Sequence, residues 1–191
     1  MLSTSAGLKA LRAAVPALIA VFLFARAPSP AAAQDTALEF AVKATYLYKF
    51  APFVEWPPQT FRSATDAITL CVVGDDPFGA MLDQAVVGQH VGDRPVALRR
   101  MPMAVRGASC QIMFIAGSRA QPVADALAAV RGTPVLTVTD RSPESRAKGI
   151  VNFVIQDNRV RFEIDNQAAA QDRLAISSKL LSLAVLGRAN E

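Results

Sequence analysis

Few of the side chains that usually carry enzyme chemistry are present in this chain of 191 residues. The single histidine, His90, stands in the polar stretch VGQHVGDR, where a lone histidine is far more often solvated than catalytic. No serine or cysteine lies in a nucleophile motif, and no set of histidines and cysteines has the spacing of a zinc site. The glycines form no phosphate-binding or dinucleotide-binding loop. The sequence therefore predicts a protein that is not an enzyme and that uses no cofactor and no metal.

One group of polar residues has the arrangement of a small-molecule site. Its members follow three predicted strands and are Asp75, Ser118, Arg119, Asp140 and Arg141. In an open α/β sheet, ligands bind beyond the carboxyl ends of the strands. These five residues are therefore a candidate ligand crevice. A small-ligand-binding module without catalytic activity is accordingly one of two functions that the sequence leaves open.

The first 33 residues have the pattern of a cleaved signal peptide, and residues 34–191 form one predicted domain. Lys9 and Arg12 precede an apolar stretch over residues 13–25, and the small residues of AAAQD offer a cleavage site after Ala33. The apolar stretch is short for a hydrocarbon core of about 30 Å, so a retained anchor is the less favoured alternative. We therefore expect a soluble protein that is exported to the periplasm.

Cleavage also changes the net charge. The whole chain has a formal net charge of +4, but Lys9, Arg12 and Arg26 all precede the cleavage site and no acidic residue does. The remaining chain has a net charge of +1, because three positive charges are removed from +4. Such a small excess gives no reason to expect a nucleic-acid partner.

The two cysteines, Cys71 and Cys110, both lie in the predicted domain. An exported chain with an even number of cysteines most simply pairs them in a disulfide. In the loop-entropy description, a disulfide that closes a loop of this length stabilises the fold by about 4 kcal/mol. The alternative is two buried free thiols.

Strand and helix patterns alternate through the middle of the chain. The predicted helices cover residues 35–50, 76–87, 120–130 and 166–187, and the predicted strands cover 67–74, 94–101, 110–117 and 133–140, with a β-hairpin over 149–165. The alternation predicts a single three-layer α/β domain, in which helices flank a mixed, mostly parallel sheet. A C-terminal β-hairpin and a long final helix complete this prediction. The expected helix caps are Asp35 or Thr36, Asp76 and Asn166, and Gly187 ends the final helix.

The segment YLYKFAPFVEWPP contains five aromatic residues and lies partly in the first predicted helix. On a helical wheel one apolar stripe consists of Phe40, Ala44, Leu47, Ala51 and Val54, and a second includes Tyr46, Phe50 and Phe53. Pro52 is expected to kink the helix. A helix that is apolar on two sides needs a cover on both sides. The second side, together with Trp56, is therefore expected to pack either against the final helix or against another protein chain.

Several of these motifs together resemble the YfiR family. They are YLYKFAPFVEWP, GDDPFG, CQIMFIAG and GIVNFVIQDNRVRFEIDNQAAAQDRLAISSKLLSLA, in the same order through nearly all of residues 34–191. The resemblance implies a periplasmic protein that represses an inner-membrane diguanylate cyclase by binding its periplasmic sensor region. It also implies effects on c-di-GMP signalling and biofilm formation, an outer-membrane lipoprotein that can sequester the repressor, and a homodimer.

The resemblance extends to the cysteines, because Cys71 and Cys110 match cysteine positions of the family. A further pair that some members have is absent, since residues 142–153 contain no cysteine. This absence favours one structural disulfide over graded redox sensing, although loss of the disulfide is one expected means of control. For contacts with the partner we expect the aromatic residues Tyr46, Phe50, Phe53 and Trp56, and the polar residues Arg161, Glu163 and Lys179. The alternative for Arg161 and Glu163 is a solvated strand face.

Overall fold

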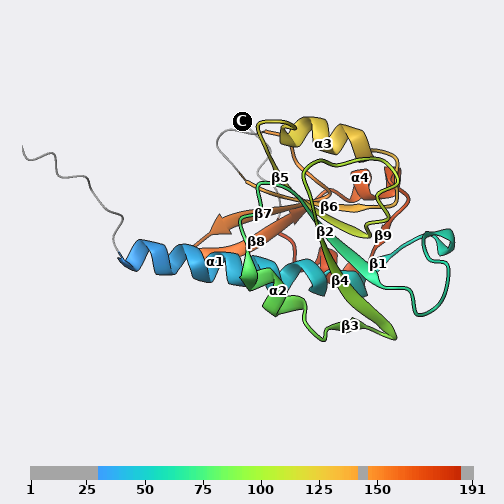
Figure 1. Ribbon diagram of the computed structural model, residues 1–191, viewed down its shortest axis with the longest axis horizontal. Coiled ribbons are helices and arrows are strands. Elements are labelled where there is room, and N and C mark those ends of the chain that lie inside the picture. Colours follow the sequence, from blue (N-terminus) through green and yellow to red (C-terminus); the bar gives the residue numbers. More distant parts are fainter. Residues whose placement is uncertain (1–29, 142–145, 186–191) are drawn as a thin grey trace, which may run out of the picture.

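The structure, a computed structural model, describes residues 30–141 and 146–185. A sheet of seven strands forms its middle layer (Figure 1), in the order β3-β4-β2-β5-β6-β7-β8. The strands are β2 (Ile68–Gly74), β3 (His90–Val91), β4 (Arg94–Met101), β5 (Ile112–Gly117), β6 (Leu136–Asp140), β7 (Val151–Gln156) and β8 (Arg159–Ile164). The five inner strands are parallel, while β3 and β8 pair antiparallel at the two edges. The predicted mixed, mostly parallel sheet is confirmed.

Helices cover both faces of this sheet (Figure 1). They are α1 (Pro30–Lys49), α2 (Ala80–Val86), α3 (Val123–Val130), α4 (Asn166–Gln171) and α5 (Ser178–Leu181). The helices α1 and α2 share one face, where Leu47 and Leu82 pack on strand residues such as Ile112. The helix α3 packs on the other face through Ala126 and Val130. The predicted three layers are therefore present.

The helix α1 differs from its prediction at both ends. It begins at Pro30, ahead of the expected caps Asp35 and Thr36, and it ends at Lys49. A 3-10 turn, η1 (Ala51–Phe53), follows and contains Pro52. Since proline has no N–H for an α-helical hydrogen bond, Pro52 ends the helix where a kink was expected. The inward stripe was predicted correctly, and its buried members are Ala44, Leu47, Ala51 and Val54.

The prediction of one long final helix is wrong. The segment instead forms α4, a short strand β9 (Ala175–Ile176) and α5. The chain turns at Arg173, which has a left-handed φ of 62°. The carboxylate of Asp172 accepts a hydrogen bond from the Gly132 N–H at the end of α3. The strand β9 then pairs antiparallel with β1 (Val54–Glu55), which directly follows η1. Contacts with distant parts of the chain thus interrupt a locally helical pattern.

Other helix ends also differ from the expected caps. The helix α2 begins at Ala80, and Asp76 accepts a hydrogen bond from the Phe78 N–H in the preceding loop. Asp165 caps α4 in place of Asn166, by accepting from the Ala168 N–H. Residues 1–29 and Gly187 lie outside the described residues, so the predicted signal peptide and the predicted helix end stay predictions. No helix within residues 30–141 and 146–185 has both the length and the apolar character needed to cross a membrane.

Candidate functional site

The connections that leave β2 and β5 run in opposite directions across the sheet. The chain passes from β2 through α2 to β4 on one side, and from β5 through α3 to β6 on the other. Such a reversal leaves a crevice outside the carboxyl ends of the two strands, where ligands of open α/β sheets bind. A cavity of about 700 Å³ lies at this position. Its volume is within the usual range for small-molecule sites.

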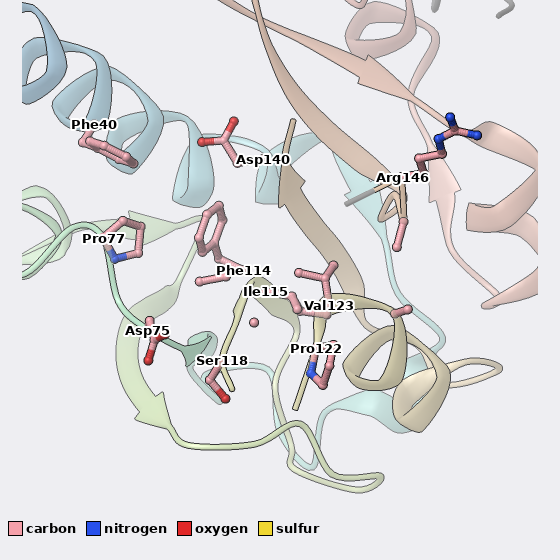
Figure 2. Close-up of a pocket in the computed structure, with 14 residues that line it drawn as sticks. Phe40, Asp75, Pro77, Phe114, Ile115, Ser118, Pro122, Val123, Asp140 and Arg146 are labelled. Atoms are coloured by element: carbon pink, nitrogen blue, oxygen red, sulfur yellow. The ribbon is translucent and has the colours of Figure 1, made fainter. Parts of the chain in front are cut away.

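Three of the five predicted crevice residues line this cavity, and two do not (Figure 2). Asp75, Ser118 and Asp140 are lining residues. Arg119 is exposed and lies outside the lining, and the Arg141 guanidinium is directed to β8, 3.6 Å from the carboxylate of Glu163. The sequence analysis missed Arg146, which also lines the cavity.

Two glycines hold the floor of the cavity in place. Gly74 and Gly117 have positive φ angles of 87° and 75°, and a Cβ on Gly74 would lie 2.2 Å from the Gly117 carbonyl oxygen. The Asp75 N–H donates to that same carbonyl at 2.9 Å. Only glycine accommodates this close approach. The strand ends are thereby fixed together, which positions Asp75 and Ser118 side by side.

Aromatic rings form much of the remaining wall. Phe40 of α1 and Phe114 of β5 both contact Phe78 edge to face, with ring centroids 5.7 Å and 4.7 Å apart. This geometry is a favourable one for aromatic pairs. The wall is therefore ordered by its own packing, because Phe78 ties α1 to the sheet.

A buried lysine, which the sequence analysis also missed, stands beside the cavity. The Lys43 side chain is 1% exposed, and its Nζ donates to the carboxylates of Glu39 and Asp140. Burial raises the pKa of Asp140, although the neighbouring Lys43 acts in the opposite direction. The sequence does contain an indication that Lys43 is buried, because this residue lies between Phe40 and Leu47 on the apolar stripe of α1.

The polar side chains of the cavity lining are those of Asp75, Ser118, Asp140 and Arg146. The Ser118 hydroxyl accepts a hydrogen bond from the Gln121 N–H at 3.2 Å, and no histidine is among the lining residues. His90 is exposed in the edge strand β3. Within the described part of the chain, no three histidine, cysteine, aspartate or glutamate residues are grouped so that they could hold a metal ion.

The second aromatic side of α1 is covered by the β7–β8 hairpin, which neither sequence-based alternative anticipated. The Phe50 ring lies 5.1 Å from Phe162 and 6.0 Å from Phe153, and the residue is 1% exposed. Tyr46 is half-buried, with its ring 5.8 Å from that of Phe162. Phe50 therefore belongs to the core in this conformation, and Tyr46 remains partly accessible.

The other two predicted aromatic contacts lie near the C-terminal segment. The Phe53 carbonyl accepts the Ser177 N–H at 2.9 Å, and the Lys179 Nζ lies 5.8 Å from the Phe53 ring. Trp56 is half-buried against Phe61, and its indole N–H has no acceptor among the described residues. Phe53 and Lys179 therefore form one partly exposed region around η1 and α5, and Trp56 follows along the chain, after β1.

A second hollow lies between the start of α1 and the tip of the hairpin. We call it the hairpin groove; its volume is about 430 Å³ and its apolar lining is Leu38, Val42, Tyr46, Ile155 and Val160. Leu38 is 66% exposed and Ile155 is 50% exposed, so two large apolar side chains of the same groove face solvent. Arg159 and Arg161 line the rim of the groove.

Arg161 and Glu163, the two polar residues of β8 that were predicted as partner contacts, lie in different surroundings. Arg161 is exposed at the groove, whereas the Glu163 side chain is 12% exposed and its carboxylate lies 2.9 Å from the Lys148 Nζ. The prediction placed Arg161 and Glu163 together at a partner surface. Their alternation on one strand face is present, but Glu163 is already paired with Lys148 and Arg141.

The predicted disulfide between Cys71 and Cys110 is confirmed, and two free thiols are excluded. It joins Cys71 of β2 to Cys110, two residues before β5 begins, with the two Cα atoms 5.9 Å apart. Both cysteines are buried, and Arg99 lies over the bond with its Nη2 atom 3.2 Å from the Cys110 Sγ.

Comparisons with known proteins support the resemblance seen in the sequence. A search of curated proteins finds no match. The family model described as YfiR/HmsC-like matches residues 40–185, which includes α1 from Phe40 onward, the whole sheet and the C-terminal segment. The chain therefore belongs to the YfiR/HmsC-like family.

Proposed function

We propose that this protein is an exported, non-catalytic regulator that represses an inner-membrane signalling enzyme of the diguanylate cyclase class by direct contact. The observation that carries the proposal is the family match over residues 40–185, since the resemblance to this family implies a periplasmic repressor. The predicted signal peptide over residues 1–33 is in agreement with export. The partner is the periplasmic sensor region of that enzyme, and an outer-membrane lipoprotein that sequesters the repressor would relieve the repression.

The hairpin groove is the best-supported contact surface for such a partner. It combines exposed apolar side chains, Leu38 and Ile155, with the charged rim residue Arg161. Protein interfaces commonly have this composition, in which an apolar centre is surrounded by a polar rim. The region around Phe53, Trp56 and Lys179 is a second candidate for contact, and a homodimer would use one of these two surfaces.

Repression requires preferential binding to one state of the partner. A regulator shifts an equilibrium only by the difference between its affinities for the active and inactive conformations. A tenfold preference for the inactive state corresponds to about 1.4 kcal/mol, and stronger repression needs a larger difference. Loss of the Cys71–Cys110 bond would be a second route to release, because it would loosen the sheet that supports α1 and the hairpin.

The test is a deletion of the gene followed by complementation with variants of the groove. Deletion should raise cellular c-di-GMP and biofilm formation, and the wild-type protein should restore both to normal. The variant Ile155→Glu, alone or with Leu38→Glu, should accumulate as folded protein but fail to restore repression, because it places a charge in an apolar interface.

Val87→Glu is the matched control, since Val87 is 73% exposed at the end of α2 and lies outside the groove. This control should repress like the wild type. Unchanged c-di-GMP after deletion would refute the cyclase proposal altogether. Full repression by the Ile155→Glu variant would instead refute only the assignment of the groove.

A further inference from the structure

We propose that the crevice at the ends of β2, β5 and β6 binds a small organic cation, namely a protonated amine carried on an apolar body. This inference goes beyond the proposed function, which needs no small ligand. It rests on the position of the cavity, on its charge and on its aromatic wall.

The position comes from the topology of the sheet. The cavity opens where the connections after β2 and β5 diverge, and its volume is about 700 Å³. The loop after β2 contributes Asp75, while the end of β6 contributes Asp140. The glycine contact between Gly74 and Gly117 holds the ends of β2 and β5 together at the floor of the cavity.

The charge of the cavity is negative on the side of α1 and β2. Asp75 is exposed and has no ion-pair partner among the described residues. Asp140 and Glu39 share one cation, Lys43, which leaves this group with one uncompensated negative charge. The nearest positive group in the lining, Arg146, has its guanidinium directed away from the side where Asp75 and Ser118 lie (Figure 2). An ammonium group on the ligand would balance the excess negative charge.

The walls favour a cation with an apolar body. Nine of the fourteen lining residues are apolar, including Phe40 and Phe114. The face of an aromatic ring attracts positive charge. The Phe40 ring already illustrates this attraction, since the Lys43 Nζ lies 5.0 Å from its centroid. The crevice therefore has apolar area for the ligand body and carboxylates for its charged end.

Three small probes of the same shape separate charge selection from simple apolar binding. They are phenethylammonium, the anion 3-phenylpropionate and the neutral 2-phenylethanol, titrated into the purified protein by calorimetry and by NMR. Phenethylammonium should bind saturably and at least about tenfold more tightly than the other two, because a charge-assisted hydrogen bond is lost in both. Equal binding of all three, preference for the anion, or no saturable binding of the ammonium would each overturn the proposal.

Two pairs of variants locate the binding. Asp75→Asn should weaken phenethylammonium about tenfold, whereas Asp157→Asn, at the exposed hairpin tip, should have no effect. Ala124→Trp should obstruct the mouth of the cavity, because Ala124 is an exposed lining residue of α3. Ala128→Trp, one turn later on α3 and outside the lining, should leave binding unchanged. If Asp75→Asn and Asp157→Asn behave alike, binding is not in this crevice. None of these measurements depends on the proposed partner, so they succeed or fail independently of it.

Discussion

The positive charge of a buried lysine has to be compensated by nearby negative charges. The Lys43 side chain is 1% exposed, and the carboxylates of Glu39 and Asp140 compensate its charge. Removing one partner from a buried ion pair is costly, since the remaining charges stay buried without compensation. Lys43→Met should therefore destabilise the fold by about 3 kcal/mol at pH 7, measured by urea denaturation. Lys49→Met is the control, because Lys49 is exposed at the end of the same helix and should have little effect.

The same variant should show a distinct pH dependence. The folded-state pKa of Asp140 is raised above its usual value of 3.8 by burial. Between that value and the raised one, the folded state binds more protons than the unfolded state, so stability falls as pH rises. Removal of Lys43 raises the pKa further, because the lysine acts to lower it. The stability lost in Lys43→Met should therefore shrink as pH is lowered from 7 towards 4; a loss that does not change with pH would contradict this account.

At this scale, residue type and position along the chain indicate some neighbours but not others. Asp75, Ser118 and Asp140 were expected to meet because each one follows or ends a predicted strand, and all three line one cavity. Arg119 and Arg141 lie outside this lining, since successive residues after a strand point in different directions and only the folded loop determines which one faces the crevice. Lys43 was missed because its partner Asp140 lies on a distant strand.

Among the secondary-structure elements, the β7–β8 hairpin has a turn whose backbone geometry determines which residues fit it. Its two turn residues, Asp157 and Asn158, have left-handed φ angles of 51° and 56°. This is the two-residue turn that favours glycine at the second position. Asn158→Gly should stabilise the protein by about 0.5 kcal/mol, and Asn158→Val should destabilise it by more than that. Thermal denaturation measures both; a stabilising valine would mean that the turn has another geometry in solution.

The broken C-terminal segment gives a second element-scale prediction. Leu180 is buried in α5, whereas Leu183 is 59% exposed. Leu180→Ala should cost about 3 kcal/mol and Leu183→Ala less than about 0.5 kcal/mol. A single long helix would place the two leucines on one buried stripe, so similar losses for both variants would contradict the structure. Chemical denaturation of the two variants under the same conditions measures both stability losses.

The failure to predict this break has a physical cause. Apolar periodicity over residues 166–187 is a local signal, and it indicated a helix correctly for α4 and α5. The interruption depends on the pairing of β9 with β1 and on the hydrogen bond between Asp172 and Gly132. Both partners lie far away in the sequence, so a window along the chain does not contain the information.

At the scale of the whole molecule, the disulfide restrains the unfolded chain. It joins cysteines separated by 39 residues, and such a loop corresponds to about 4 kcal/mol. The double variant Cys71→Ala with Cys110→Ala should lose about this much stability and should melt identically with or without reductant. Wild-type protein should lose comparable stability on reduction. Unchanged melting together with altered repression would indicate a redox switch instead of a structural bond.

The overall architecture was more predictable than its details. Alternating patterns were enough for a three-layer domain with a mostly parallel sheet, because parallel strands need long crossover connections, which are usually helices. They were not enough for the strand order, in which β2 lies between β4 and β5. Nor did they predict that the hairpin would cover Phe50, since the second apolar side of α1 can be satisfied by any apolar surface.

The pairing of β1 with β9 also determines when this chain can finish folding. Val54 pairs with Ile176, and the Val185 N–H donates to the Phe162 carbonyl, so both ends of the domain depend on its last residues. Contacts between such distant positions form late, because closing a long loop is entropically unfavourable. If the protein is exported with its N-terminus first, α1 reaches its compartment well before the hairpin that covers Phe50. During that interval the aromatic face of α1 would be open to a chaperone, and a chain that ends before the hairpin would keep it open.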